Sequence, residues 1–229
     1  RLVALNRWDS GIGTHISMRI PGPEHHFLIN PFGWFFEEIT ASSLVKIDLE
    51  GRIVQDTPYR VNPAGFVIHS AIHMAREDAA CVIHLHTDEG IAVASQKEGL
   101  LPITQFGALT IDRLAYHEFE GVALNLGERE RLVADLGEKT VMLLRHHGTL
   151  AVGPTAAEAW SRMVILETAC RQQIMALTAG RDGVKRAPQA AIDLMREQFG
   201  DGRIAREGAE LSWAAYLRRL NRNAPGYDA

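Results

Sequence analysis

Histidines at two places in the sequence could hold a metal ion together. His84 and His86 lie two residues apart in an apolar run of strand-forming residues, so both imidazoles would project to one face of a β-strand. His147 follows a second apolar run, 141–144, and could bring a third imidazole to the same point. Three neutral imidazoles suit a zinc-like ion, and a catalytic site of this kind leaves coordination positions open for water or substrate. The competing interpretation is that the His-x-His pair is accidental in a chain with ten histidines.

The hydrophobic pattern predicts the elements that must position these histidines. Strands are expected at residues 15–20, 27–30, 44–48, 52–54, 81–86, 141–145 and 150–152. The first two of these strands, and the next two, are joined by short Pro/Gly-rich or Gly-containing turns that favour antiparallel hairpins. Helices are expected at residues 62–76, 91–98, 128–137, 155–179, 188–199 and 211–221, with Thr155 as the N-cap of the longest.

Composition limits the classes of function. A chain of 229 residues with 46% hydrophobic side chains can form one large α/β domain or two small ones with a sizeable core. The formal net charge of -4 argues against a general nucleic-acid-binding protein. No apolar run approaches the roughly 18 residues of a membrane helix, so no membrane partner is expected. The two cysteines, Cys81 and Cys170, lie in apolar segments and are expected to be reduced and buried, which favours a cytoplasmic location.

A series of short motifs, taken in order, resembles the class II aldolase/adducin superfamily. The motifs lie at Gly13 to Arg19, Asn30 to Gly33, Ile39 to Leu44, Asp48 to Gly51, Phe66 to His69, Val82 to Thr87 and Arg145 to Gly148. The likeness covers nearly all of residues 2–180, and the local sequence of residues 99–103 resembles the adducin-like branch more closely than the sugar-phosphate aldolases.

The resemblance implies a fold and an assembly. The fold would be a three-layer α/β/α sandwich around a central mixed, largely antiparallel sheet. Residues 1–205 would form the class II aldolase/adducin-like domain, and residues 206–229 would form a helix and tail that pack on this domain or on a neighbouring subunit. Family members commonly form tetramers with active sites at subunit contacts, so a homotetramer is expected. His84, His86 and His147 match the family's three zinc ligands.

Two departures from the family pattern bear on chemistry. In the typical aldolase the metal stabilises the enediolate formed when a carbon–carbon bond breaks, and a glutamate moves the proton. The glutamate position is Gly65, which has no side chain to act as an acid or base. The family's phosphate-binding asparagine falls on His15, and its hydroxyl residue beside Gly33 falls on Phe32. Its serine pair falls on Pro63–Ala64. An ordinary sugar-phosphate aldolase is therefore not expected, although His15 and Gly33 remain candidate substrate-binding residues.

Three further residues are candidates for proton transfer. His69 lies four residues after Gly65 on the predicted helix, so its side chain could point toward the vacated position, although a structural role in helix packing is the alternative. Tyr116 and Glu118 lie where the family often supplies a tyrosine to a neighbouring subunit's site. The alternative interpretation of these two residues is that they form an exposed, polar strand end. His15 faces the former phosphate site and could bind a carboxylate.

The leading functional hypothesis is a divalent-metal-dependent lyase. An ion held by the three histidines, with zinc first and iron, manganese or cobalt as alternatives, would chelate a small carbonyl or hydroxy-acid compound and stabilise its enolate. Decarboxylation of a β-keto acid needs this electron sink more than a base, which fits Gly65. Two alternatives stay open: an iron-dependent oxygenase on the same scaffold, and a non-catalytic, adducin-like assembly module.

Overall fold

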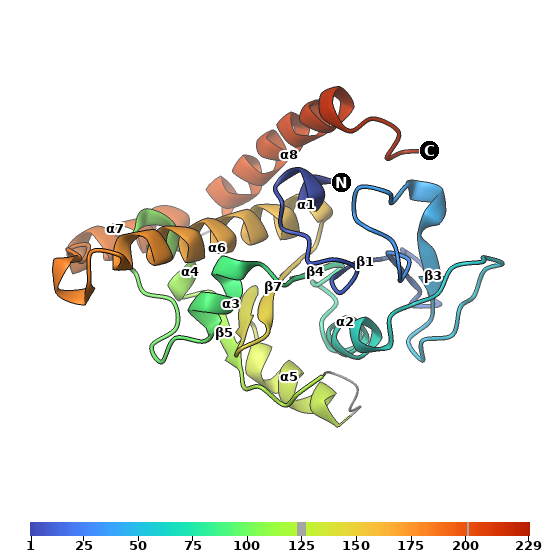
Figure 1. The fold of residues 1–229 in the computed structure, drawn as a ribbon, viewed down its shortest axis with the longest axis horizontal. Coiled ribbons are helices and arrows are strands. Elements are labelled where there is room, and N and C mark those ends of the chain that lie inside the picture. The colour runs from blue at the N-terminus through green and yellow to red at the C-terminus, as the bar shows by residue number, and fades with distance from the viewer. Residues whose placement is uncertain (123–126, 201) are drawn as a thin grey trace.

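The computed structural model describes residues 1–122, 127–200 and 202–229, and within them seven strands form one mixed sheet (Figure 1). The strand order is β3-β2-β1-β4-β7-β6-β5, and every neighbouring pair is antiparallel except β5 with β6. The strands are β1 His15–Arg19, β2 Phe27–Ile29, β3 Val45–Ile47, β4 Cys81–Leu85, β5 Leu114–His117, β6 Val141–Leu144 and β7 Gly148–Gly153.

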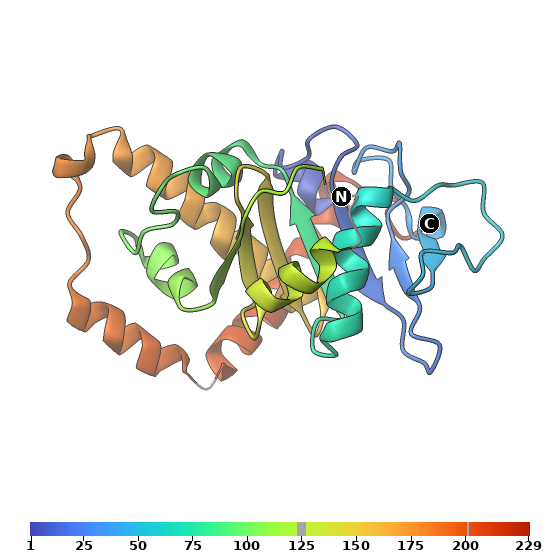
Figure 2. The ribbon, with the colours of Figure 1, turned by 90° about the horizontal axis from the view of Figure 1, so that it is seen from below.

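Helices cover both faces of the sheet (Figures 1 and 2). Helices α2 and α5 pack on one face, which we call the α2 face, and helices α1, α3, α4, α6 and α8 pack on the other, the α6 face. The helices are α1 Leu2–Leu5, α2 Pro63–Ala75, α3 Asp88–Ala94, α4 Gln105–Ile111, α5 Glu128–Leu136, α6 Ala156–Leu177, α7 Gln189–Phe199 and α8 Arg203–Asn223, with short 3-10 turns at Ala41–Ser43 and Arg181–Gly183. The predicted three-layer α/β/α sandwich with a mixed, largely antiparallel sheet is confirmed.

Side-chain alternation along β4 assigns the predicted metal ligands to one face. Ile83 and Leu85 belong to the core of the α6 face, whereas Val82 belongs to the core of the α2 face. Because successive strand residues point to opposite faces, His84 projects to the α2 face, and its neighbour in register on β1 is His15. The metal-ligand strand is thus in the middle of the sheet, buried between two apolar layers.

Some elements differ from the sequence-based expectation. Helix α3 begins at Asp88, because Thr87 caps it by accepting a hydrogen bond from the Gly90 N–H, and not at residue 91 as expected. The expected strand 52–54 reduces to a single bridge between Ile47 and Ile53. Helix α8 begins at Arg203 instead of residue 211.

Helix α4 was not expected from the sequence, and strand β5 was raised only as a possible strand end at Tyr116 and Glu118. Helix α4 is seven residues long and contains Gly107, which breaks the apolar pattern of a helix. A Cβ at Gly107 would lie 2.6 Å from the carbonyl oxygen of Leu101, so the glycine is required by close packing. Strand β5 has four residues and is the edge strand of the sheet.

The C-terminal segment folds back onto the rest of the chain. Helix α8 lies along α6, and the tail after it returns to the 3-10 turn Ala41–Ser43 (Figure 1). Ala41 and Ser42 donate backbone hydrogen bonds to the carbonyl oxygens of Tyr227 and Ala229, both 2.9 Å long. The division between residues 205 and 206 stays a prediction. No helix among the described residues is long and apolar enough to cross a membrane.

Candidate metal centre

The three predicted ligands converge. His84 is on β4, His86 follows that strand directly, and His147 lies in the turn between β6 and β7. One ring nitrogen from each histidine lies within 4.8 Å of those of the other two, and the Nε2 atoms of His84 and His86 are 2.9 Å apart. These three residues can hold one metal ion, because a tetrahedral site needs nitrogen atoms that point at a common centre and leaves its fourth position free.

Neighbouring backbone fixes the His84 ring. The Nδ1–H of His84 donates to the carbonyl oxygen of Thr149 over 2.9 Å, since a carbonyl can only accept. The Nε2 atom therefore carries the lone pair that a metal requires. Gly148 is needed beside it, because a Cβ there would lie 2.3 Å from the carbonyl oxygen of Leu85, and also close to the rings of His86 (3.0 Å) and His84 (3.2 Å).

Burial keeps these imidazoles in the neutral form that binds metals. Burial, reinforced by repulsion from His147 and His86, lowers the pKa of His84 well below its usual range. Burial is also the first cause of the lowered pKa of His147, about 4, and of the lowered pKa of His86. At neutral pH the three rings are unprotonated and can coordinate a cation without first releasing protons.

His15 fills the space above Gly65. An ideal Cβ at Gly65 would lie 2.6 Å from both Cγ and Cδ2 of the His15 ring, so a larger residue at position 65 and this position of His15 exclude one another. The His15 ring also stacks on His84, with centroids 6.0 Å apart and planes 21° from parallel. His15 is 3% exposed, and neither of its ring nitrogens has a partner among the described residues. Burial, with His86 and His147 nearby, lowers the pKa of His15 to about 4.

His69 lies behind His15, farther from the three ligands. The two rings meet edge to face, with centroids 5.7 Å apart, and His69 is fully buried. Its Nδ1 atom hydrogen bonds to the hydroxyl of Ser17 over 2.6 Å. The structure therefore brings His15 beside the metal ligand His84 and His69 beside His15.

The other predicted site residues lie apart from this group. Gly33 is in the loop after β2 with a φ of 94°, and open space surrounds the position of a Cβ. Tyr116 packs against the core of the α6 face, across the sheet from His84. Its hydroxyl oxygen accepts from the Leu100 N–H over 2.9 Å, and the guanidinium of Arg145 lies 4.4 Å from its ring centroid. Glu118 is largely exposed. Roles for these residues in a neighbouring subunit's site stay predictions.

Sequence reasoning missed a buried glutamate that ties the ligand-bearing segments together. Glu167 of α6 accepts hydrogen bonds from the hydroxyls of Thr87 (2.6 Å) and Thr149 (2.5 Å). Thr87 directly follows the ligand His86, and the carbonyl oxygen of Thr149 accepts from His84. Burial is the main cause that raises the pKa of Glu167 to about 7, against the lowering effect of the two hydroxyls. An acidic residue on the apolar side of the predicted helix 155–179 was the available signal.

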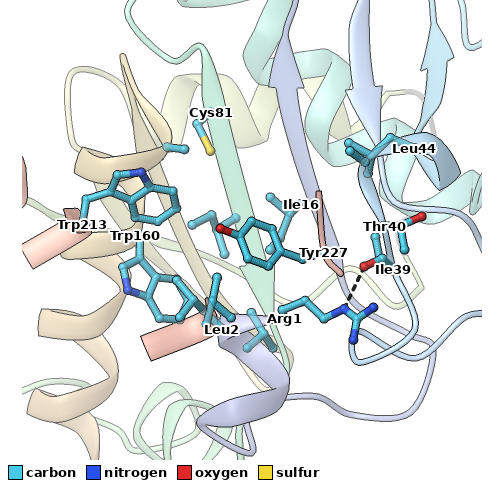
Figure 3. Close-up of a pocket in the computed structure, with 15 residues that line it drawn as sticks. Arg1, Leu2, Ile16, Ile39, Thr40, Leu44, Cys81, Trp160, Trp213 and Tyr227 are labelled. Atoms are coloured by element: carbon cyan, nitrogen blue, oxygen red, sulfur yellow. Dashed lines mark hydrogen bonds between the residues drawn. The ribbon is translucent and has the colours of Figure 1, made fainter. Parts of the chain in front are cut away.

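A separate cavity lies on the α6 face, across the sheet from the histidines (Figure 3). Its volume is about 280 Å³, and Trp160, Trp213 and Tyr227 enclose it together with the aliphatic side chains of Ile16 and Leu2. The lining offers few polar atoms that could take part in a reaction. The three-histidine cluster is therefore the candidate functional site.

The fold and the three-histidine site define a class II aldolase-type scaffold. The family model described as "Class II Aldolase and Adducin N-terminal domain" matches residues 1–174, and the chain belongs to this family.

Relatives of this chain include both proteins named as aldolases and adducins. A candidate aldolase class 2 protein of Caulobacter vibrioides is 62% identical over 99% of this chain and 88% of its own length. Rat alpha-adducin is 43% identical over 78% of this chain, but the match spans only 25% of the adducin. A solved structure of L-fuculose 1-phosphate aldolase from Glaciozyma antarctica superposes with a TM-score of 0.85 at 26% identity, covering 100% of this chain and 88% of that one.

Removal of His84 on β4, or of His147 in the turn between β6 and β7, should abolish metal binding. In His84→Ala and His147→Ala variants, two nitrogens remain, which is too few for a tight site. We expect bound zinc, measured by elemental analysis after dialysis, to fall from about one ion per chain to a small fraction of that. His25→Ala, in an exposed turn, is the control and should keep the ion. Unchanged stoichiometry in both ligand variants would refute the site.

An alanine at position 65 should destabilise the protein, although alanine favours helices. Gly65→Ala places a Cβ 2.6 Å from the His15 ring, and such overpacking costs roughly 1–3 kcal/mol. Gly208→Ala on α8 is the matched control: its Cβ meets no atom within 4 Å, and we expect it to stabilise the chain by up to about 1 kcal/mol. Urea unfolding measures both changes. Equal stabilisation by the two substitutions would show that His15 does not occupy the space above Gly65.

Glu167 should make the free energy of unfolding depend on pH. Its folded pKa of about 7 exceeds the ordinary glutamate value of 4.5, so the folded state binds more protons between these values. Its contribution is thus most favourable below about pH 4.5 and falls as the pH rises to about 7, by on the order of 3 kcal/mol. Buried histidines with lowered pKa values raise the free energy of unfolding over part of this range, so the contribution of Glu167 is measured as the difference between the wild type and Glu167→Gln. In urea-unfolding curves this difference should fall as the pH rises from 5 to about 7. A pH profile identical to that of the wild type would contradict the assignment.

Proposed function

We propose that this protein is a divalent-metal-dependent lyase that acts on a small carbonyl or hydroxy-acid compound. The observation that supports the proposal most directly is the convergence of His84, His86 and His147 as neutral imidazoles at one point. When bound there, zinc or a similar ion would supply Lewis-acid chemistry for a reaction that breaks a bond to carbon. His84, His86 and His147 would hold the ion, and the more exposed side formed by His86 and His147 leaves access for the substrate.

The residues around the site favour a reaction that needs little help from a base. Gly65 provides no carboxylate, and its space is filled by His15, which is neutral at pH 7. Decarboxylation of a β-keto acid releases carbon dioxide without a proton being removed by the enzyme, so it suits this site better than an aldol cleavage that depends on a glutamate. His15 contacts the substrate in this proposal, and His69, one ring farther from the metal, acts through His15 as a positioning residue.

The assembly and location belong to the same proposal. Loop residues such as Gly33, and Tyr116 with Glu118 on β5 and after it, would complete the site across subunit contacts of a homotetramer in the cytoplasm. Within one chain Tyr116 lies across the sheet from the metal ligands, so in this proposal it acts in the site of a neighbouring chain.

A non-catalytic assembly module is the second candidate, and the similarity to alpha-adducin together with Gly65 favours it. In that case the metal would be structural, or absent. An iron-dependent oxygenase is the third, because three histidines with open positions also suit Fe(II). These candidates differ in which metal they need and in what they consume.

Metal exchange followed by an activity screen distinguishes these functions. The full chain is stripped with a chelator, reloaded with zinc, manganese or iron, and assayed with a panel of β-keto acids and hydroxy-ketones. We expect zinc or manganese to restore release of carbon dioxide or of a carbonyl fragment at least about 100-fold above the stripped protein, and His84→Ala to prevent restoration. Oxygen uptake with iron alone would support the oxygenase. No metal binding and unchanged stability would support the assembly module.

A further inference from the structure

A cavity of about 680 Å³, which we call the α8 cavity, lies between α4, α6 and α8. Asp78, Thr140 and Pro154 line it, and these residues lie just outside the ends of β4, β6 and β7. The three metal ligands are at the other ends of the same strands. Four residue steps along β4 separate its two ends by about 13 Å, so the α8 cavity and the metal centre are different sites.

Three arginines of the α8 cavity come from separate parts of the chain. Arg113 lies between α4 and β5, Arg162 is on α6, and Arg206 is on α8. Arg162 is held in place by two hydrogen bonds, from Nη2 to the carboxylate of Glu158 (3.0 Å) and from Nη1 to the carbonyl oxygen of Val152 (2.6 Å). Arg162 therefore has its own counter-ion within the cavity wall.

The other two arginines have no carboxylate partner among the described residues. The side chain of Arg113 makes one long hydrogen bond, from Nη2 to the carbonyl oxygen of Phe199 at 3.5 Å, and no ion pair of the described chain includes Arg206. The second carboxylate of the lining, Asp78, is already bound by Arg76 at 2.5 and 2.8 Å. Two positive charges in the wall of the α8 cavity are thus left without compensation.

A bound anion would relieve two unfavourable features of this wall. Burial is the first cause of the lowered pKa of Arg162, and repulsion from Arg113 adds to it, against the attraction of Glu158. The hydroxyl oxygen of Thr140 is buried and lacks a partner within the described chain. Thr140 is beside Arg113, because its N–H donates to the carbonyl oxygen of Arg113 over 3.1 Å. An anion at this end of the cavity can accept from both side chains.

The rest of the lining is suited to an apolar group. Aromatic side chains come from three helices, Phe106 of α4, Phe199 of α7 and Tyr216 of α8, and Leu109 and Ile165 lie among the aliphatic ones. Aromatic rings pack favourably on other rings as well as on aliphatic carbon. A volume of about 680 Å³ is in the range of sites that bind small molecules, and an inorganic anion alone would leave its apolar part unfilled.

We propose that the α8 cavity binds a phosphate monoester with an aromatic body, as a ligand site separate from the metal centre. Arg113 and Arg206 bind the phosphate, the Thr140 hydroxyl donates to it, and the aromatic side chains contact the body. A phosphate monoester carries close to two negative charges at pH 7, which matches two uncompensated guanidinium groups better than a single carboxylate does. The inference goes beyond the proposed lyase function and needs no metal.

Three probes separate the contributions of charge and ring. 1-Naphthyl phosphate has both, inorganic phosphate has only the charge, and 1-naphthol has only the ring. By isothermal titration calorimetry of the full chain, we expect 1-naphthyl phosphate to bind about tenfold or more tightly than either of the other two. Equal affinity for 1-naphthyl phosphate and inorganic phosphate, or no binding of 1-naphthyl phosphate, would overturn the proposal.

Arginine variants place the binding in the α8 cavity. Arg113→Met should weaken the binding of 1-naphthyl phosphate about tenfold, and Arg206→Met, which removes an exposed charge, about threefold. Arg218→Met is the control, because Arg218 is exposed on α8 outside the cavity and should leave the affinity unchanged. Urea unfolding checks that each variant is folded. Because Arg206 is on the surface, its variant tests the charge even if Arg113→Met does not fold, and unchanged affinity in Arg206→Met would overturn the proposal.

The metal-ligand variant distinguishes this inference from the proposed function. His147→Ala removes a metal ligand at the far end of the strands, and we expect it to bind 1-naphthyl phosphate as tightly as the wild type. Loss of binding in His147→Ala would place the phosphate at the metal centre and overturn the proposal. A protein without metal-dependent activity that still bound the probe in an arginine-dependent way would contradict only the proposed lyase function.

Discussion

The space between the start of β1 and the first turn of α2 can hold one side chain, and the whole site depends on which one it holds. With glycine at position 65, the His15 ring enters this space and stacks against His84. A glutamate at position 65 would need the volume that the ring occupies, so the two arrangements exclude one another. The two departures from the family pattern, at positions 15 and 65, are therefore a single structural change. It replaces a flexible carboxylate with a planar ring held by its neighbours on both sides.

The rigidity of the ligands comes from the opposite side of the sheet. His84 points to the α2 face, but the carbonyl that orients it belongs to Thr149, whose hydroxyl bonds to Glu167 on the α6 face. Thr87 bonds to the same carboxylate and caps α3 immediately after His86. The segment after β4 and strand β7 are thus joined through one buried carboxyl group. Burial raises the pKa of this carboxyl group, and its two hydrogen bonds fix the positions of Thr87 and Thr149 beside the ligands.

The sequence predicted the parts of this site that depend on local periodicity. The spacing of two residues between His84 and His86 predicted that both side chains project to one face of a strand. The apolar run before His147 predicted that this histidine follows the end of a second strand. The sequence could not show that His15 and Gly65 share one space, because 50 residues separate them and only the pairing of β1 with β4 brings His15 beside α2. Helix α4 was missed, and strand β5 was raised only as a possible strand end, for a different reason: both are short, and Gly107 interrupts the pattern of α4.

Buried histidines with unpaired ring nitrogens surround the predicted metal ligands. His15, His69, His73 and His84 are all at most 4% exposed, and within the described chain three ring nitrogens of His15 and His69 lack partners. Each such atom costs about 1–3 kcal/mol, and an apolar side chain of similar shape would remove that cost. A metal ion held by His84, His86 and His147, with a polar ligand beside it, would complete the coordination and the hydrogen bonding of this cluster.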